Sequence, residues 1–221
     1  GTASIESIWT SHVQNGNYVA APMSFASGNS LFVTNNAYQQ LPSWVSAALP
    51  TGEIVKDIQL KSQNGSGLGL KGAILCQSGT IYTIDWAAFS TTISIQSALS
   101  SIIDMHMDAA NDKITALNAT GQLYTLDLTA LPNGWVQEFS GITGSFKALY
   151  RNGSAIQLVG IDKLKVQLGA APSTTNLTNA IVPSQINHLF THPNTAQIIA
   201  LGTDGQLYVL DNQKWKHKAT S

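Results

Sequence analysis

The sequence has little charge and only one arginine. Of its 221 residues, 10% are charged, whereas an average soluble protein has about 25%. Eleven basic residues nearly balance twelve acidic ones, and Arg151 is the only arginine. A nucleic-acid groove or a polybasic membrane surface needs a stripe of basic residues. The composition therefore predicts neither a nucleic-acid partner nor membrane insertion.

The chain also lacks the residues from which most cofactor and metal sites are built. Cys76 is the single cysteine, which excludes an intrachain disulfide and a cysteine-based zinc cluster. The five histidines show no metal-ligand spacing, and neither a phosphate-binding glycine loop nor a nucleophilic serine elbow is present. No apolar run reaches the roughly 18 residues of a membrane helix, and no signal-peptide pattern appears. We expect no cofactor and no metal, with Cys76 as a small core residue.

Uncharged polar residues take the place of the missing charges. Serine, threonine, asparagine and glutamine make up roughly a third of the chain, and 43% of the residues are hydrophobic, so a folded core is expected. The first residues, Gly1-Thr2-Ala3-Ser4, include no methionine and look like a cleavage or cloning scar. Two alternatives stay open: a fragment of a longer protein, or a mature protein with a processed start.

One motif recurs along the whole chain: a leucine, several small or polar residues, a turn residue and an aliphatic–aromatic pair. The clear copies are Leu75–Tyr82, Leu117–Tyr124 and Leu201–Tyr208, and the weaker ones are Phe25–Phe32 and Leu158–Lys165. Repetition at such a regular spacing is typical of repeat architectures. Each copy has Gly79, Gly121, Gly205, Asn29 or Asp162 at one position. These residue types tolerate positive φ, so we predict positive φ there and a two-residue hairpin in each copy.

Two further apolar stretches accompany each hairpin. Upstream there is a pair of apolar residues spaced by three: Ile5/Ile8, Val55/Ile58, Ile102/Met105, Phe146/Leu149 and Ile186/Leu189. Downstream there is a fourth stretch, which starts at Trp44, Trp135 or Trp215 in three copies and reads 92–95 or 176–178 in the other two. Each unit thus has four short strands. We place the units at 4–52, 53–100, 101–144, 145–185 and 186–221, within one domain.

The third strand of the clear copies is apolar on both faces, as in Leu207–Asp211. A strand of this kind must be covered on both sides. Five four-stranded units covered by their neighbours predict an all-β protein, a five-bladed β-propeller. A solenoid is the alternative, but the units leave no residues for its caps. Residues 93–107 could also pass as an amphipathic helix, which we reject because Ile102 and Met105 fit the repeat.

The copies Ser78–Tyr82, Thr120–Tyr124 and Asp204–Tyr208, followed by Trp135 and Trp215, resemble the tachylectin-2 and tectonin-like propellers. This resemblance implies a glycan-binding propeller with shallow sites between adjacent blades. It further implies that the sites use the connections from one blade to the next. Those connections are 49–53, 97–101, 140–144 and 182–185, and they share no polar set. One to three occupied sites are therefore expected instead of five.

Three sets of residues are candidates for binding or chemistry. Trp44, Trp135 and Trp215 either supply rigid platforms for sugars or pack against the next blade. Asp85, Asp127 and Asp211, with Asn35 in the first unit, either accept sugar hydroxyls or end the third strand as structural acceptors. One position of the innermost strands is occupied by Ser7, Asp57, Asp104, Ala148 and His188. Two carboxylates and a histidine near a channel could serve a glycosidase or hold a cation, but bridging water is the usual case.

These observations predict a non-enzymatic recognition propeller that binds surface glycans, with Trp44, Trp135 and Trp215 as candidate binding residues. The alternative is a structural or host-attachment module of a viral or phage tail or another large assembly, with a protein partner. A glycosidase is the third interpretation. An extracellular or virion-associated location is expected under the first two.

Overall fold

The computed structural model consists of β-strands and turns, without a helix among the residues it describes. These residues are 7–10, 13–15, 18–20, 23–34, 43–62, 69–87, 90–108, 112–129, 134–140, 142, 146–152, 155–160, 164–168, 173–176, 186–191, 197–202, 204–211 and 214–218. The predicted all-β class is confirmed. The region 93–107 contains two strands in place of the rejected helix.

Five four-stranded antiparallel sheets follow one another along the chain, and we number them 1 to 5. Sheet 1 contains β1 (Ser7–Thr10), β4 (Met23–Ser27), β5 (Ser30–Thr34) and β6 (Val45–Ala48). Sheet 2 contains β7 (Val55–Ser62), β8 (Leu70–Cys76), β9 (Ile81–Trp86) and β10 (Ser94–Leu99). Sheet 3 contains β11 (Ile102–Asp108), β12 (Lys113–Asn118), β13 (Leu123–Asp127) and β14 (Val136–Phe139).

The last two sheets have the same strand order. Sheet 4 contains β15 (Phe146–Asn152), β16 (Ala155–Gly160), β17 (Leu164–Leu168) and β18 (Ser173–Asn176). Sheet 5 contains β19 (Ile186–Thr191), β20 (Ile198–Gly202), β21 (Leu207–Asp211) and β22 (Lys214–His217). A separate hairpin, β2 (Val13–Asn15) with β3 (Tyr18–Ala20), is inserted between β1 and β4 of sheet 1.

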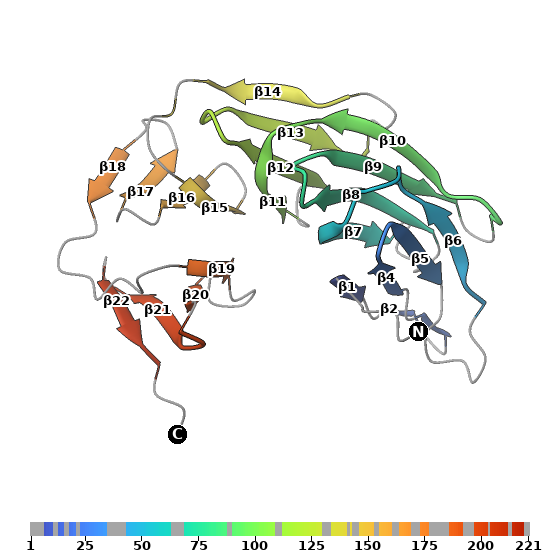
Figure 1. Ribbon diagram of the computed structural model, residues 1–221, viewed down its shortest axis with the longest axis horizontal. Helices are drawn as coiled ribbons and strands as arrows, with labels where there is room; N and C mark the ends of the chain where they lie inside the picture. The colour runs from blue at the N-terminus through green and yellow to red at the C-terminus, as the bar shows by residue number, and fades with distance from the viewer. Residues whose placement is uncertain are drawn as a thin grey trace.

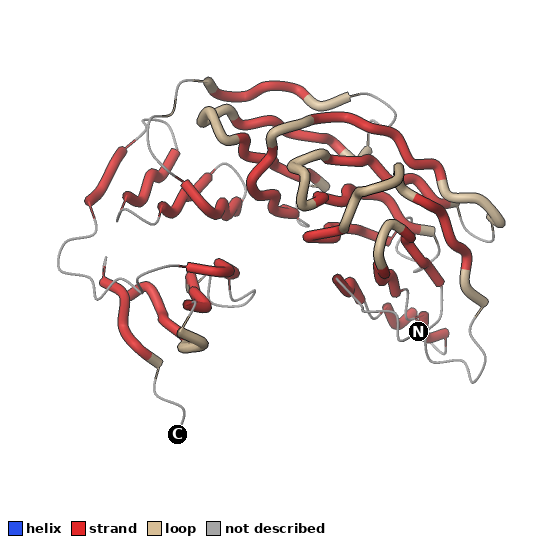
Figure 2. The backbone as a smooth tube through the Cα atoms, viewed as in Figure 1, coloured by secondary structure: helices blue, strands red, loops and turns tan. Residues whose placement is uncertain are grey.

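The sheets stand side by side in an arc (Figures 1 and 2). Their first strands, β1, β7, β11, β15 and β19, contact one another in this order along the inner side of the arc. The fourth strands of sheets 2 and 3, β10 and β14, lie on its outer side (Figure 1). The arc is open between sheets 1 and 5.

A β-bulge near the start of the first strand explains the apolar pairs spaced by three. In β7, Val55 is opposite Cys76 and Asp57 is opposite Leu75, so that Lys56 is the extra residue. Side chains of a regular strand alternate, and the extra residue brings Val55 and Ile58 to the same face, where both are buried. The same shift occurs in β11, β15 and β19.

The hairpins between second and third strands confirm three of the predicted turn residues. Gly79, Gly121 and Gly205 have φ of 84°, 77° and 74°. The loop around Gly79 has three residues, because the amide of Cys76 bonds to Thr80 O at 2.9 Å and the amide of Gly79 bonds to Cys76 O at 2.9 Å. This is a turn closed by a left-handed glycine, so the predicted two-residue loop is wrong here.

Sheets 1 and 4 depart from the predicted alignment. In sheet 1 the hairpin has a two-residue loop in which Gly28, and not Asn29, has positive φ, 57°. In sheet 4, Lys165 is opposite Val159, so Val166 takes the position that the aromatic residue has elsewhere, and the expected place of Lys165 is wrong. Asp162 lies outside the described residues.

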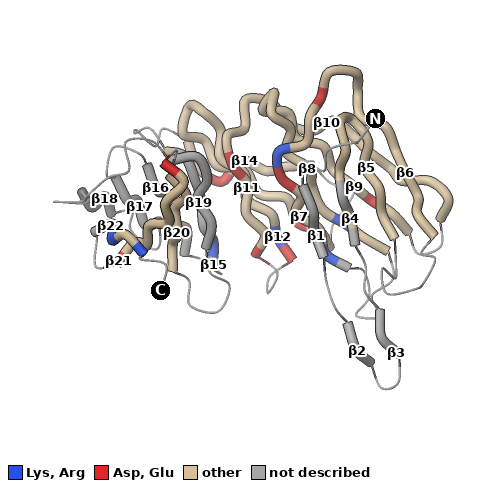
Figure 3. Tube along the Cα trace, turned by 60° about the horizontal axis from the view of Figure 1, so that its bottom comes forward, with Lys and Arg blue, Asp and Glu red and all other residues tan. Residues whose placement is uncertain are grey.

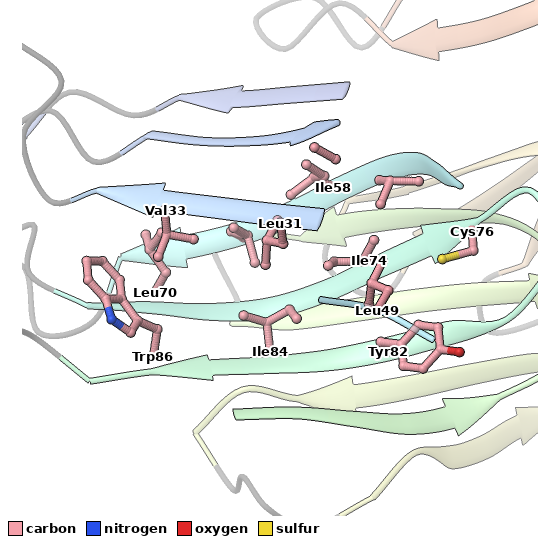
Figure 4. Packing of buried hydrophobic residues seen from close by; sticks show 13 residues of the cluster. Leu31, Val33, Leu49, Ile58, Leu70, Ile74, Cys76, Tyr82, Ile84 and Trp86 are labelled. Carbon is pink, nitrogen blue, oxygen red and sulfur yellow. The ribbon is translucent and has the colours of Figure 1, made fainter. Parts of the chain in front are cut away.

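The hydrophobic core is divided into clusters that lie between neighbouring sheets. One joins sheets 1 and 2 through residues such as Leu31, Ile74 and Trp86 (Figure 4). A second joins sheets 2 and 3, and a third joins sheets 3 and 4. The central strands of sheets 2 and 3 are therefore covered on both faces, as their two apolar faces require. Cys76 is buried in the first cluster, and burial raises the pKa of its thiol to about 12.

Candidate functional site

Hairpin loops of consecutive sheets meet the connections between sheets along one end of the strands. Leu49 N donates to Asn29 O at 2.7 Å, Ile102 N to Gly79 O at 2.9 Å, and Ile142 N to Gly121 O at 3.2 Å. We call this end the hairpin rim. It comprises 28–29, 77–80, 119–122 and 204–206 together with the connections 49–54, 100–101 and 142. Because backbone bonds fix the loops of sheets 1, 2 and 3 to a connection, the rim holds their side chains in defined places.

The rim of sheet 2 carries a carboxylate that accepts hydrogen bonds from two hydroxyl groups. Ser78 Oγ donates to Glu53 Oε2 at 2.6 Å, and Tyr82 Oη donates to Glu53 Oε1 at 3.1 Å. Ser78 Oγ also lies 2.9 Å from Thr80 Oγ1. The hydrogen bond from Ser78, aided by that from Tyr82, lowers the pKa of Glu53 in spite of its partial burial. The carboxylate is therefore ionised at neutral pH.

The rim of sheet 3 has an amide network at the equivalent place. Asn118 Oδ1 accepts bonds from the amides of Thr120 and Gln122 at 3.0 and 2.8 Å. Asn118 Nδ2 and Tyr124 Oη both reach Gln122 Oε1, at 2.6 and 3.0 Å. The tyrosine hydroxyl therefore meets an amide oxygen here, where sheet 2 has a carboxylate.

The rim of sheet 5 repeats the arrangement with an aspartate. Tyr208 Oη donates to Asp204 Oδ2 at 2.6 Å, and the amide of Gln206 donates to Asp204 Oδ1 at 3.0 Å. The hydrogen bond from Tyr208 lowers the pKa of Asp204 and raises that of the tyrosine. His217 Nε2 lies 2.7 Å from Gln206 Oε1, and its ring packs edge-on against Tyr208 at 5.7 Å.

Three sheets thus place a tyrosine hydroxyl on an oxygen acceptor of their own rim. The aromatic ring is largely buried in sheets 2 and 5, whereas the neighbouring Ser78, Thr120 and Gln206 are exposed. The carboxylate oxygens of Glu53 and Asp204 keep lone pairs that can accept a further bond, whereas Gln122 Oε1 already accepts from Asn118 Nδ2 and Tyr124 Oη and leaves its own Nε2 to donate. Sequence analysis found the loops by their glycines, but it missed the tyrosine–acceptor pairs. Glu53 precedes its loop by a whole hairpin, whereas Gln122 and Asp204 stand inside the repeated motif and were not recognised as partners of its tyrosine.

The structure does not bring the three candidate tryptophans together. They stand at the fourth strands of sheets 1, 3 and 5, in different surroundings. Trp44 is 38% exposed, whereas Trp215 is only 3% exposed. Trp135 packs against the cluster between sheets 2 and 3, and neither its indole N–H nor that of Trp215 has a hydrogen-bond partner. Trp44 thus has the most accessible face, and the burial of Trp215 fits the packing interpretation.

The aspartates after the motif tyrosine form local bonds in two sheets. Asp127 Oδ1 accepts from the amide and the hydroxyl of Thr129 at 2.9 and 2.7 Å. Asp211 Oδ2 accepts from Lys216 Nζ at 2.6 Å. Asp85 is exposed at the end of its strand, and Asn35 lies outside the described residues. Asp127 therefore ends its strand as a structural acceptor.

The innermost position brings Asp57 and Asp104 into electrostatic contact across β7 and β11. Asp104 Oδ2 accepts from Leu149 N in sheet 4 at 2.7 Å, which joins two sheets. Desolvation raises the pKa of Asp104 to about 7, and the charge of Asp57 acts in the same direction. Asp57 itself accepts from Ile58 N at 2.8 Å. Of the other members of this set, nothing is described for the side chains of Ser7, Ala148 and His188.

Arg151 forms a junction that sequence analysis did not predict. From β15 its guanidinium donates to Thr115 Oγ1 at 2.8 Å and Thr125 Oγ1 at 3.0 Å. It also donates to both carboxylate oxygens of Glu138, at 2.9 and 3.3 Å. The only arginine of the chain thus spans three strands of sheet 3 from sheet 4. The partners lie too far apart in sequence to form a recognisable motif.

The described residues contain neither a metal-binding cluster nor a membrane-spanning helix. No group of three or more histidine, cysteine, aspartate or glutamate side chains is placed to hold a metal ion within the described part. The described ranges also include no helix long and apolar enough to cross a membrane. Comparison with models of known protein families finds no match, and comparison with curated proteins finds none either.

Proposed function

We propose that the five sheets are the blades of a five-bladed propeller in which sheet 5 docks on sheet 1. The common strand order and the sequential contacts of the first strands support this proposal. Leu207 of sheet 5 is half-buried, whereas its equivalents Ile81 and Leu123 are fully buried against the next sheet. Leu207 therefore lacks the neighbour that covers the same position in sheets 2 and 3. Burying such apolar surface favours closure by about 25 cal/mol per Å².

The function that this geometry supports best is non-enzymatic recognition of glycans at the hairpin rim, as in the propellers that the sequence resembles. The observation that carries the proposal is the tyrosine–acceptor pair at Glu53, Gln122 and Asp204. Sugars present hydroxyl groups, and an ionised or amide oxygen on a rigid support receives such donors well. Exposed hydroxyl and amide side chains beside each acceptor add further partners. Each site is shallow, so useful affinity arises from several rims together.

Hydrolysis is not part of the proposal. A glycosidase needs one carboxylic acid and one carboxylate on opposite sides of the same bond. The rims of sheets 2, 3 and 5 pair their carboxylate or amide with a tyrosine and not with a second acid. The adjacent Asp57 and Asp104 are engaged with backbone amides at 2.8 and 2.7 Å. These bonds favour a structural role for the two aspartates.

A glycan array with matched variants tests this function. Gln122→Ala and Asp204→Ala remove the polar side chains of two rims, and Gln96→Ala removes an exposed amide from β10, away from the rim. We expect the first two to lower retention on the glycan surface several-fold and Gln96→Ala to leave it unchanged, with thermal unfolding recorded for all three. Trp44→Ala separately tests the platform. Absence of any retained glycan, or equal losses in all variants, would reject the proposal.

A specific observation favours a second candidate, attachment within a larger assembly. On the edge strand β14, Val136 is 66% exposed and Phe139 is 40% exposed. An edge strand with exposed apolar side chains is suited to pairing with another protein. Under this interpretation the glycan array stays negative while the chain is retained by its parent assembly.

A further inference from the structure

Two charged side chains that reach across a junction find an opposite charge on the neighbouring sheet, whereas Lys56 of sheet 2 donates to the backbone carbonyl of Ile103 in sheet 3 at 2.6 Å. Lys61 of sheet 2 forms an ion pair with Asp112 before β12 of sheet 3. Glu138 of sheet 3 forms an ion pair with Arg151 of sheet 4 at 2.9 Å. We call the side of a sheet that faces the next sheet in chain order its forward face. At both of these junctions the neighbouring sheet supplies the opposite charge.

The forward face of sheet 5 carries basic residues. Residues opposite one another in an antiparallel pair share a face. Lys216 is opposite Val209, and Lys218 follows two residues later, where its amide bonds to Leu207 O at 2.8 Å. Leu207 corresponds to Leu123, whose cluster lies against sheet 4, so this side of sheet 5 is its forward face. Lys214 occupies the register position opposite Asp211 on the same face.

One of these charges is balanced within the sheet. Lys216 pairs with Asp211, and both side chains are largely exposed. Lys218 is exposed and has no acidic partner among the described residues. In the sequence 211–218 this stripe of alternate lysines has three lysines for one aspartate. Figure 3 shows basic residues beside β21 and β22.

Sheet 1 follows sheet 5 in the proposed ring, and its strands contain no charged residue. Residues 7–52 contain no aspartate, glutamate, lysine or arginine. The opposite charge that the junctions of sheets 2 and 3 and of sheets 3 and 4 provide is therefore absent from the strands of sheet 1. Glu6, directly before β1, lies outside the described residues, so no described residue of sheet 1 balances the stripe.

Lysines on an exposed strand also protect the edge of a sheet from pairing with another chain. If they served only this purpose here, the other outermost strands should carry them as well. The four equivalent strands read Val-Ser-Ala-Ala, Ser-Ile-Gln-Ser-Ala-Leu, Val-Gln-Glu-Phe and Ser-Thr-Thr-Asn, without a single lysine. The basic stripe is thus specific to the last sheet.

We propose that Lys216 of β22 and Lys218, which directly follows this strand, form a binding site for an acidic saccharide, one that carries sulfate or carboxylate groups. This inference rests on the proposed glycan recognition and names a ligand class for one part of the surface. Alternate residues of a strand are spaced by about 6.6 Å, so the ammonium groups can contact successive acidic groups of an extended chain. The net charge of −1 argues against general attraction of polyanions.

Binding of a heparin-derived hexasaccharide by the full chain tests the proposal. We expect wild-type protein to bind at 50 mM salt and to weaken as salt screens the lysines. The double variant Lys216→Gln/Lys218→Gln should lose at least tenfold in affinity. Lys71→Gln, which removes a charge from sheet 2, is the matched control and should bind as wild type does. Thermal unfolding of each variant verifies that the fold is intact.

Other outcomes separate this inference from the proposed function. Neutral glycans retained on the array without hexasaccharide binding would overturn the acidic site alone. An equal loss in Lys71→Gln would also overturn it, because the attraction would then be unspecific. Tighter binding of a polyglutamate peptide than of the hexasaccharide would instead identify an acidic protein segment as the ligand and overturn the saccharide. Failure of every glycan, neutral or acidic, would overturn the proposed function as well.

Discussion

Two glycines in equivalent turns differ in what surrounds them. Gly121 has φ of 77°, and a Cβ there would lie 2.0 Å from Ile142 O. Gly205 has φ of 74°, but nothing lies within 4 Å of its Cβ position. Both positions are left-handed and cost a side chain about 1 kcal/mol or more. Only Gly121 is also in close contact with the backbone of a connection.

We therefore predict that Gly121→Ala destabilises the protein more than Gly205→Ala does. Gly205→Ala should lower the free energy of unfolding by about 1 kcal/mol, which is the conformational cost alone. Gly121→Ala should lower it by at least twice this amount, because the backbone at Ile142 must shift. Urea unfolding of both variants measures the difference. Equal losses would show that the connection does not hold the rim in place.

Asp104 gives the stability of the protein a dependence on pH. Desolvation raises its pKa to about 7, whereas an aspartate of the unfolded chain titrates near 3.9. The folded protein thus binds the proton more tightly, and the contribution of this group to stability is largest at low pH. It is lost as the pH rises toward 7.

Asp104→Asn removes this dependence while it keeps an acceptor for Leu149 N. Relative to the Asn variant, the wild type should gain on the order of 2 kcal/mol in unfolding free energy between pH 8 and pH 5. Urea unfolding at several pH values between these limits gives the two profiles. Parallel profiles would mean that Asp104 titrates as an ordinary exposed carboxyl group.

At the scale of elements, the ion pair of Arg151 and Glu138 joins two sheets, whereas the ion pair of Lys216 and Asp211 lies within one sheet. Arg151 is 9% exposed and bonds to Glu138 and two threonines. Lys216 and Asp211 are largely exposed. Removing one partner of a buried pair leaves the other charge without compensation, whereas exposed pairs contribute about 1 kcal/mol or less.

Double-mutant cycles should separate the two pairs. For Arg151→Met with Glu138→Gln we predict a coupling free energy above about 1.5 kcal/mol. For Lys216→Met with Asp211→Asn we predict less than about 1 kcal/mol. Both are obtained from urea unfolding of the single and double variants. A coupling for Arg151 as small as that for Lys216 would contradict its role as the junction of sheets 3 and 4.

An element could be predicted from the sequence when the residues that determine its conformation are neighbours in the chain. Gly79, Gly121 and Gly205 were predictable, because a left-handed turn needs glycine whatever surrounds it. Asn29 was not, since the loop of sheet 1 is one residue shorter and moves the positive φ to Gly28. In the sequence, the bulges were visible only as a spacing of three between apolar residues, and this spacing was not recognised as a bulge. At the candidate site, the rim loops were predictable, whereas Glu53 and Arg151 depend on partners that only folding brings near.

At the scale of the whole molecule, closure of the ring decides how the first and last sheets meet. Ser46, Ser97, Gln137 and His217 occupy equivalent positions on the outermost strands. Each lies opposite the aromatic residue of the repeated motif on the third strand of its own sheet. All four are exposed. In a closed ring of equal blades, neighbouring positions are separated by one common distance.

The distance between spin labels on sheets 1 and 5 tests the propeller most directly. Labels are attached to cysteines placed at Ser46 and His217, and a reference pair is placed at Ser97 and Gln137 on adjacent sheets. The buried Cys76 remains, because a thiol whose pKa is raised to about 12 reacts little with the label. A closed five-bladed ring predicts one narrow distance for Ser46 and His217, equal to that of the reference pair. A longer or broad distribution beside a narrow reference would contradict closure.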